Sequence, residues 1–470
     1  MTGSWATFGA DLHLDLTAAA GTRGLRAALT EALREAARSG RLTPGTRLPS
    51  SRSFAADLGI ARNTVAEAYA ELVAEGWLTA RQGSGTRVAE RARPRRPAGT
   101  ARAHRPARRG PAYSLVPGTP DLSGFPRTAW LTAARRALAV APDAAFGYAV
   151  DARGRVELRE ALAGYLARAR GVYTDPDRIV LCAGFVHALT LLGQVLKGRR
   201  VREVAVEGYG LDIHRQLLEG AGLRTRPLPL DEAGARTGDL AALGPRTGAV
   251  LLTPAHQFPT GVALTPQRRA AAVDWARSSG GLILEDDYDG EFRYDRQPVG
   301  ALQGLDPDRV VYLGTASKSL APGLRMGWMV LPPDLVDEVL EAKGRIDWTS
   351  SAVEQLTLAE FLTSGAYDRH VRGMRLRYRR RRDELVAALA GRVPVSGIAA
   401  GLHAVLDLPA GTERSVIQAA AWQDLALEGL ARYRHPASTM PPREALVVGY
   451  GTPPPSTWTP TLTALTSTLP

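Results

Sequence analysis

The chain has 470 residues, which is more than one ordinary hydrophobic core accommodates, so we expect two or three domains. Its composition, 45% hydrophobic and 23% charged, is typical of a globular protein, and no apolar run approaches the ~20 residues that span a membrane. The single cysteine, Cys182, excludes an internal disulfide, and the first residues show no signal-peptide pattern, so we expect a cytoplasmic protein without membrane contact.

The net charge of +12 is distributed unevenly along the chain. Residues 1–112 contain 18 Arg and 9 acidic residues, a net charge of +9, whereas the remaining residues have a net charge of +3. A coding bias toward Arg would not concentrate the excess in one quarter of the chain. A basic N-terminal part on a nearly neutral body predicts that this part binds a polyanion.

Residues 22–89 have the pattern of one compact helical unit that ends in a hairpin. Apolar residues at helical spacing over 25–36 predict a first helix, and a short second helix over 50–58 begins with a serine N-cap. A third helix is expected over 62–75, followed by a β-hairpin over 77–88 with a glycine-rich tip. This order predicts a winged helix-turn-helix.

The expected winged helix places polar side chains where DNA-binding proteins contact a duplex. The third helix begins with polar groups at the position where a recognition helix meets base edges, and the amides at the start of the second helix favour a phosphate. Arginines flank the glycine tip of the hairpin, which can approach a minor groove or the DNA backbone closely. The residues expected to contact DNA are Ser50, Ser51, Arg52, Arg62, Asn63, Thr64, Arg81, Gln82, Gly83 and Arg87.

The same segment closely resembles the winged helix of the GntR family. The resemblance is carried by GRLTPGTRLPSSR at 40–52, LGIARNTV at 58–65 and RQGSGT at 81–86. It implies binding to a double-stranded DNA operator. The alternative is a winged helix that serves as a protein-interaction module, which the basic charge disfavours.

Two segments without a folding pattern flank this unit. Residues 1–21 are expected to form an N-terminal arm. Residues 90–112 hold eight Arg and four Pro with hardly an apolar side chain beyond Ala, so we expect an extended, mobile linker. The body follows over 113–470.

In the body, short apolar runs alternate with helical patterns. The runs expected to be strands are 178–181, 204–206, 249–252, 282–284 and 310–313. The alternation predicts an α/β domain with a mainly parallel sheet covered on both faces. From about residue 340, amphipathic helices and short strands predict a smaller C-terminal lobe.

Two of these strands are followed by residues with the chemistry of a coenzyme site. Asp286 and Tyr288 follow the strand over 282–284, and Lys318, one of only three lysines, lies in a hydroxyl-flanked loop further on. Pyridoxal phosphate requires an amine for a Schiff base, a carboxylate for its pyridine nitrogen and a donor to its ring 3-oxygen, and we assign these roles to Lys318, Asp286 and Tyr288. The candidates for binding its phosphate are Thr315, Ser317, Arg325 and the backbone of Gly184, Phe185 and Val186.

Each of these residues also has an ordinary structural alternative. Lys318 would then be a solvated loop lysine, Arg325 an ion-pair partner, and the acidic run over 285–291 a cation site. The acidic run lacks the spacing of a calcium loop, so we expect no metal ion. The order and spacing of the whole set favour the coenzyme.

The body resembles fold type I aminotransferases, and more closely the aminotransferase-like domain of the MocR/GabR branch of GntR-type regulators. Its markers are GTPD at 118–121, TPAHQFPTG at 253–261, EDDYDGEF at 285–292 and RHVR at 369–372. The resemblance implies that the assigned Asp, Tyr, Lys and Arg positions bind pyridoxal phosphate. It also implies a head-to-tail homodimer in which Tyr148 reaches the phosphate of the partner subunit's coenzyme.

The chain departs from the aminotransferase pattern at three places. Phe258 stands where a true aminotransferase usually has an Asn that contacts the ring oxygen, as is typical of the regulators. The phosphate loop continues into Val186 and His187 where many relatives carry Ser and Gln, so it offers backbone amides only. The arginine for a substrate carboxylate is not fixed by the pattern, and Arg432 and Arg434 are the candidates.

We therefore expect a bacterial DNA-binding transcriptional regulator, associated with the nucleoid when bound, whose body senses an amine, an amino acid or pyridoxal phosphate itself. The Lys318 linkage then serves sensing and need not support turnover. One alternative is a working aminotransferase that carries a DNA-binding head, which Phe258 disfavours. Another is a DNA-binding scaffold with an empty body, which the intact coenzyme set disfavours.

Overall fold

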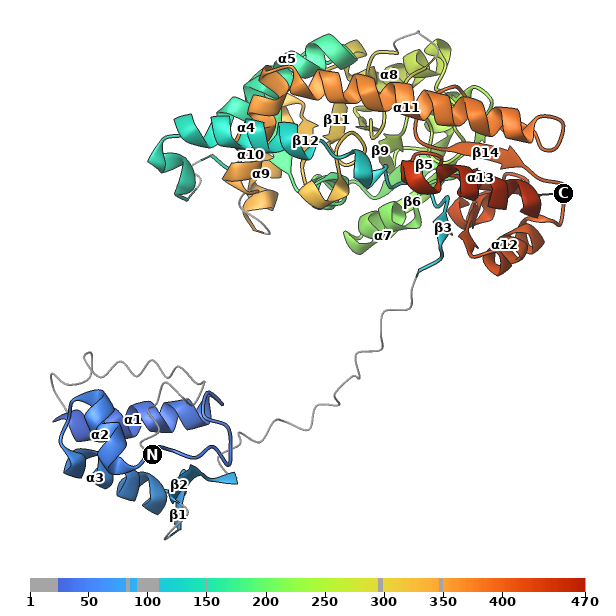
Figure 1. Cartoon of the computed structure of the whole chain (residues 1–470). Helices are drawn as coiled ribbons and strands as arrows, with labels where there is room; N and C mark the ends of the chain where they lie inside the picture. The colour runs from blue at the N-terminus through green and yellow to red at the C-terminus, as the bar shows by residue number, and fades with distance from the viewer. Residues whose placement is uncertain are drawn as a thin grey trace. The chain divides into compact units, whose positions relative to one another are not determined.

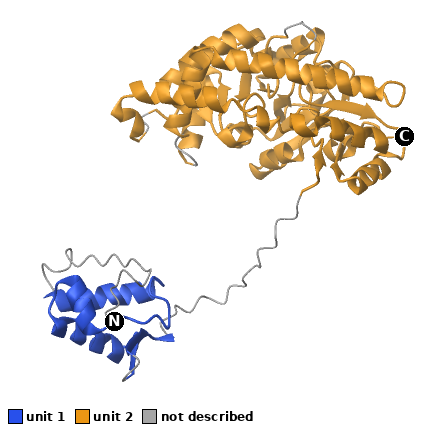
Figure 2. Cartoon of the chain, in the orientation of Figure 1, with its two compact units in different colours: residues 1–108 blue, residues 109–470 orange. Residues whose placement is uncertain are grey.

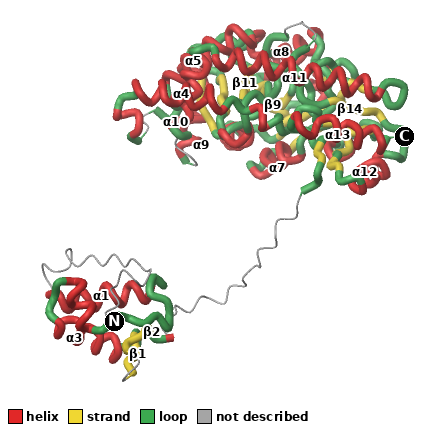
Figure 3. Tube along the Cα trace, viewed as in Figure 1, coloured by secondary structure: helices red, strands yellow, loops and turns green. Residues whose placement is uncertain are grey.

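The computed structural model describes residues 24–81, 85–90, 110–148, 151–294, 299–345 and 350–469. The chain forms two compact units, residues 1–108 and 109–470 (Figures 1 and 2). The first unit is mainly helical with a short hairpin, whereas helices and strands are interleaved in the second (Figure 3). Among the described helices, none is both long and apolar enough to cross a bilayer.

The first unit packs three helices against each other and ends in a hairpin. Its elements are α1 (Gly24–Arg38), α2 (Ser51–Leu58), α3 (Arg62–Ala74), β1 (Leu78–Arg81) and β2 (Gly85–Val88). The Ser50 hydroxyl accepts a hydrogen bond from the Ser53 amide and so caps α2, and Gly59 ends this helix in the left-handed conformation. The apolar helix faces meet in one core that includes Phe54 and Leu72. The predicted winged helix-turn-helix is confirmed.

The second unit is built on a seven-stranded sheet in the order β4-β12-β11-β10-β9-β5-β6. The strands are β4 (Ile179–Cys182), β5 (Glu203–Glu207), β6 (Arg224–Leu228), β9 (Thr247–Leu252), β10 (Leu282–Asp286), β11 (Val310–Thr315) and β12 (Gly327–Val330). Only β12 runs antiparallel to its neighbours in this sheet, so the predicted mainly parallel sheet is confirmed. The sequence pattern did not reveal β6, because its two arginines and proline suit an edge strand but break an apolar run.

Helices cover both faces of this sheet because its strands are apolar on both sides. One face packs against α6 (Phe185–Gly198), α7 (Asp212–Gly220) and α9 (Val336–Gly344). The other face packs against α4 (Arg127–Val140), α5 (Val156–Arg170), α8 (Pro266–Ser279) and α10 (Ala352–Thr363). Within β5, Val204 and Val206 belong to the first core and Ala205 to the other, as strand alternation requires.

A smaller antiparallel sheet forms the second lobe. It has the order β13-β14-β17-β16, with β13 (Val395–Ser396), β14 (Ala404–Asp407), β16 (Glu428–Gly429) and β17 (Ala445–Val448). It packs against α11 (Ala366–Leu389), α12 (Glu413–Trp422) and α13 (Pro455–Thr468). The long helix α11 contributes Val371 to a core of the large sheet and Tyr378 to the core of the small lobe, and so crosses both (Figure 1).

The small lobe differs from the segment that the sequence suggested, which began at about residue 340. Helices α9 and α10 pack on the large sheet, and the core of the small lobe takes residues from Met374 onward. It also includes Leu115, because β3 (Tyr113–Ser114) pairs in parallel with β15 (Leu425–Ala426). Helical periodicity shows that a helix has a buried face, but not which core buries it.

Candidate coenzyme and DNA-binding sites

The strands of the large sheet end at one cavity of about 310 Å³. Glu207, Asp286 and Thr315 stand at the ends of β5, β10 and β11, which run parallel and therefore finish at the same edge. Eight of the residues predicted to bind the coenzyme line this cavity: Phe185, Val186, Asp286, Tyr288, Thr315, Ser317, Lys318 and Arg325.

Lys318 presents a half-buried amine to the cavity. Its Nζ donates a hydrogen bond to the backbone carbonyl of Gly118. Burial lowers the pKa of Lys318, although the carboxylates of Asp286 and Asp289 oppose this shift. A lowered pKa increases the fraction of neutral amine, which is the form that attacks an aldehyde.

Asp286 is a buried carboxyl whose Oδ1 has no hydrogen-bond partner among the described residues. Burial raises the pKa of Asp286 well above its usual value, and the charge of Asp287 adds to this rise. An unpaired buried carboxylate oxygen is costly, so this atom needs a cationic donor. The protonated nitrogen of a pyridine ring is such a donor, and the residues present therefore fit pyridoxal phosphate.

Tyr288 lines the same cavity beside Phe258, with the two ring centroids 6.1 Å apart. Its hydroxyl oxygen lies 3.1 Å from Nδ1 of His256. Burial raises the pKa of Tyr288 well above its usual value, so the side chain stays a neutral phenol at physiological pH. A neutral phenol can donate its hydrogen to an oxygen of a ligand.

Donors suited to a phosphate gather at one end of the cavity. Gly184 precedes α6 with φ 88°, and a Cβ at this position would lie 3.6 Å from Nη1 of Arg325. The Thr315 hydroxyl lies 2.8 Å from that of Ser317 and also accepts from the Ser317 amide at 3.1 Å. The first-turn amides of α6, two hydroxyls and a guanidinium together form a set that binds phosphate groups.

The winged helix exposes most of the side chains expected to contact DNA. Arg52 lies exposed in the first turn of α2, and Arg62 and Asn63 lie exposed at the start of α3. The exposed Arg87 donates from Nη1 to the carbonyl of Gly45 at 2.9 Å, so it also braces the hairpin. The remaining candidates with described positions are Ser50, Ser51, Thr64 and Arg81, whereas Gln82 and Gly83 lie outside the described residues.

Comparisons with known proteins agree with this two-part architecture. Residues 25–88 match the model of the bacterial regulatory proteins of the gntR family, and residues 118–439 match that of the class I and II aminotransferases. The chain is 33% identical to the HTH-type pyridoxine biosynthesis transcriptional regulator PdxR of Corynebacterium glutamicum, over 86% of this chain and 88% of that protein. It is 32% identical to the probable rhizopine catabolism regulatory protein MocR of Rhizobium meliloti, over 90% and 89%. The chain belongs to the MocR-type branch of the GntR family.

The body of this MocR-type chain has the fold of pyridoxal phosphate-dependent aminotransferases. It superposes on an archaeal alanine:glyoxylate aminotransferase with a TM-score of 0.67 and 26% sequence identity, over 76% of this chain and 90% of the enzyme. The predicted fold type I architecture is confirmed.

The sequence analysis did not identify several polar residues that line the cavity of this MocR-type chain. Glu207, His214 and Arg215 line the cavity from the end of β5 and from α7. His214 packs against Phe185 with ring centroids 4.5 Å apart, and its burial lowers the pKa of the imidazole to about 4. His214 and Arg215 belong to no spacing motif, because only the packing of α7 on the sheet brings them to the cavity, whereas Glu207 ends an expected strand.

Neither arginine predicted for a ligand carboxylate lines the cavity. Arg432 is largely exposed and lies 3.4 Å from Glu428 in an ion pair. Arg434 donates from Nη2 to the backbone carbonyls of Ser438 and Met440, at 2.7 and 2.6 Å. Both arginines were chosen for their position near the C-terminus, and that position in the sequence does not bring them to the cavity of Lys318.

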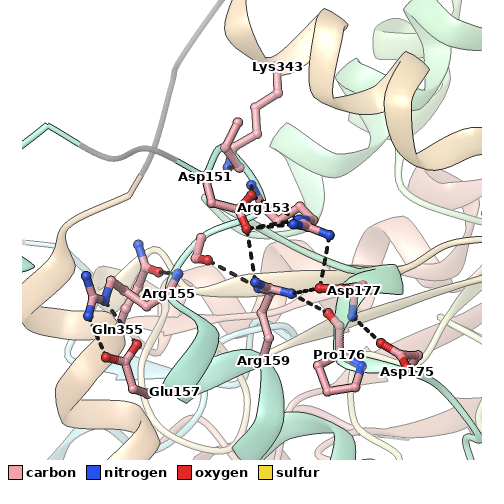
Figure 4. Close-up of polar contacts among 12 residues, drawn as sticks. Asp151, Arg153, Arg155, Glu157, Arg159, Asp175, Pro176, Asp177, Lys343 and Gln355 are labelled. Carbon is pink, nitrogen blue, oxygen red and sulfur yellow. Dashed lines mark hydrogen bonds and ion pairs between the residues drawn. The ribbon is translucent and has the colours of Figure 1, made fainter.

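Tyr148 also lies outside the cavity and is fully exposed, at 103% of its reference area. The segment that follows it is held by the buried Arg159, which binds Asp151 at 3.0 Å and Asp177 at 2.8 Å (Figure 4). The Leu181 amide of β4 donates to the carbonyl of Arg153 at 2.8 Å. These contacts hold residues 151–159, a few positions after Tyr148 in the chain, beside the large sheet.

Glu207 should make the stability of the coenzyme-free protein depend on pH. Burial raises the pKa of Glu207 to about 7, so its contribution to stability is present below pH ~4.5 and is lost as the pH rises through 7. A neutral Gln avoids this loss. We expect the free energy of unfolding of Glu207→Gln, relative to that of the wild type, to rise by roughly 1–3 kcal/mol as the pH increases from 5 to 8. Urea denaturation at several pH values measures this difference. A difference that stays constant with pH would contradict the assignment.

Proposed function

We propose that this protein is a DNA-binding transcriptional regulator whose body holds pyridoxal phosphate on Lys318 and responds to a small amino compound. The observation that carries the proposal is one cavity that both the half-buried amine of Lys318 and a buried carboxyl oxygen without a partner among the described residues share. Its relatives are named as helix-turn-helix transcriptional regulators, which supports regulation as the role of the whole chain.

When bound, the coenzyme supplies an aldehyde carbon that exchanges one amine for another. Lys318 provides the resident amine, and Asp286 keeps the pyridine nitrogen protonated. Tyr288 donates to the ring oxygen, while Arg325 and the first turn of α6 bind the phosphate. A ligand amine that replaces Lys318 frees its side chain from the linkage, and this gives the liganded and unliganded states different contacts, as regulation requires.

A carboxylate on the ligand would satisfy Arg215. This side chain is 8% exposed and donates from Nη1 to the Gly210 carbonyl at 2.9 Å. No ion pair joins it to a carboxylate within the described part of the chain, and its burial lowers the pKa of the guanidinium. The carboxylates of Asp212 and Glu219 act on this guanidinium but form no ion pair with it. A buried cation without a direct ion pair favours an anionic ligand, so we propose that the ligand is an amino acid, with Arg215 in place of Arg432 or Arg434.

The surface around Tyr148 supports a homodimer. Leu131 and Val140 of α4 are 64% and 83% exposed, and Phe146 in the short helix η4 (Asp143–Phe146) is 53% exposed. Exposed large apolar side chains are typical of a protein interface. We propose that a second copy covers this part of the chain and that Tyr148 reaches the phosphate of the partner subunit's coenzyme.

Lys318 should form the covalent linkage with the coenzyme. Pyridoxal phosphate titrated into the wild-type protein should produce an absorbance band of a protonated imine, and Lys318→Ala should abolish it. The matched control is Lys197→Ala, because Lys197 is exposed and donates only to the Gly222 carbonyl at 2.9 Å. An imine band of wild-type intensity in Lys318→Ala would contradict the assignment.

The winged helix should divide base recognition and phosphate binding between two arginines. We expect Arg62→Ala to cost about 1–3 kcal/mol and to relax base preference, whereas Arg81→Ala should weaken binding to every sequence and lower the salt slope by about 1. Gel-shift titrations at two salt concentrations measure both effects. Arg38→Ala, which removes an exposed partner of Glu35 at the end of α1, is the control. Unchanged binding in both variants would refute this interface.

Arg215 should matter only for ligands that carry a carboxylate. In Arg215→Gln, the affinity for amino acids should fall by about tenfold or more, because a charged hydrogen bond contributes about 1.5–3 kcal/mol. The affinity for the corresponding amines without the carboxylate should stay the same. Spectral titration of the coenzyme-loaded protein gives both constants, and an equal loss for both ligand classes would exclude the proposed contact.

A further inference from the structure

Tyr288 contacts a buried group of three side chains, His256, Asp289 and His403, which we call the His–Asp cluster. Each of the three is at most 4% exposed. His256 Nδ1 lies 2.8 Å from Asp289 Oδ2 and 3.1 Å from the Tyr288 hydroxyl oxygen. The rings of His256 and His403 pack at a tilt of 38° with centroids 4.8 Å apart. Of these four residues, Tyr288 is the one that lines the cavity.

The hydrogen on His256 is placed by its neighbours. Asp289 is a carboxylate acceptor, so the 2.8 Å contact requires a hydrogen on Nδ1. The other ring nitrogen, Nε2, is buried and has no partner among the described residues. A second hydrogen on Nε2 would make the ring a cation with a buried N–H that lacks an acceptor, which costs more than a neutral lone pair. The ring is therefore the neutral tautomer that carries its hydrogen on Nδ1.

This tautomer determines where the Tyr288 hydroxyl points. Because His256 donates from Nδ1, the hydroxyl oxygen accepts and must direct its own hydrogen elsewhere. Asp289 is the nearby competitor for that hydrogen, as its contribution to the raised pKa of Tyr288 shows. Oδ2 of Asp289 already accepts from His256, which makes this carboxylate a weaker competitor for the phenol hydrogen, so an acceptor in the cavity can take that hydrogen.

The surrounding packing holds the cluster in this arrangement. A Cβ on Gly401 would lie 2.2 Å from Cε1 of His256 and 2.4 Å from Oδ2 of Asp289, so only glycine leaves room for the pair. His403 donates from Nε2 to the Pro259 carbonyl at 3.1 Å. Burial lowers the pKa of His403 far below its usual value, so this ring stays neutral and places no positive charge beside Asp289.

The direction of the Tyr288 hydroxyl hydrogen is important because few other side chains can donate to the ring oxygen of the coenzyme. Phe258 stands beside Tyr288, at the position where aminotransferases usually supply a second donor, and its side chain has no hydrogen to donate. Tyr288 is left as the side chain that can donate to the ring oxygen of the coenzyme.

We propose that His256 and Asp289 are positioning residues. They orient the Tyr288 hydroxyl toward the cavity, so that it donates a hydrogen bond to the ring oxygen of pyridoxal phosphate. The inference rests on the proposed function, because it assumes that the coenzyme is the occupant. Neither residue touches the coenzyme, and both act through Tyr288.

A double-mutant cycle tests the proposal through the dissociation constant of pyridoxal phosphate. His256→Leu keeps the bulk of the side chain but removes the donor, and we expect it to weaken binding about tenfold, as the loss of one directed hydrogen bond would. His256→Asn returns an amide N–H near the position of Nδ1 and should recover most of the affinity. In a Tyr288→Phe background, His256→Leu should change affinity by less than about twofold, because the hydroxyl it orients is gone.

The same cycle with Asp289→Asn covers the case in which His256→Leu fails to fold, which thermal unfolding of the coenzyme-free proteins would reveal. An equal loss of affinity with and without the Tyr288 hydroxyl would overturn the proposal, since it would show a general packing effect. One zinc ion per chain in the purified protein would also overturn it, because a metal bound at Nδ1 would displace the hydrogen that His256 donates. Failure of the wild type itself to bind the coenzyme would instead refute the proposed function.

Discussion

The site depends on a buried carboxylate that the described residues leave unsatisfied. Three acidic residues lie close together after β10, and two of them are paired within the protein. Asp287 binds Arg170 at 2.6 Å and Asp289 binds His256 at 2.8 Å. Asp286 alone keeps an oxygen without a partner, next to the cavity that Lys318 also lines. Because a buried carboxyl oxygen without a partner is costly, this arrangement suits a cationic ligand.

The cavity couples the two lobes of the body through the chain segment that carries Gly118. Lys318 Nζ donates to the Gly118 carbonyl, and nearby Leu115 belongs to the core of the small lobe. Asp121 of the same segment binds Arg381 of α11 at 3.2 Å. A ligand that takes the place of the lysine amine therefore acts where both lobes meet, which is a suitable place for binding to be converted into a change of shape.

Much of the coenzyme site could be predicted from the sequence, because its chemistry follows strand ends. Asp286, Tyr288 and Lys318 come after apolar runs, and parallel strands bring such positions to one edge of a sheet. Glu207 ends an expected strand, and the same reasoning could have found it. Arg215 could not be predicted in this way, since α7 reaches the cavity only through tertiary packing. The same limit explains why the sequence did not show that Arg432 and Arg434 lie outside the cavity or that α9 and α10 pack on the large sheet. Periodicity identifies buried faces, but it does not identify their partners.

The central claim is that the amine of Lys318 forms a covalent linkage with the aldehyde of pyridoxal phosphate. Borohydride reduction of the coenzyme-saturated protein, followed by proteolysis and mass spectrometry of the peptides, tests it most directly. The account predicts a phosphopyridoxyl mass on the peptide that contains Lys318 and no such mass on the peptides of Lys197 and Lys343. An unmodified Lys318 in saturated protein would contradict it.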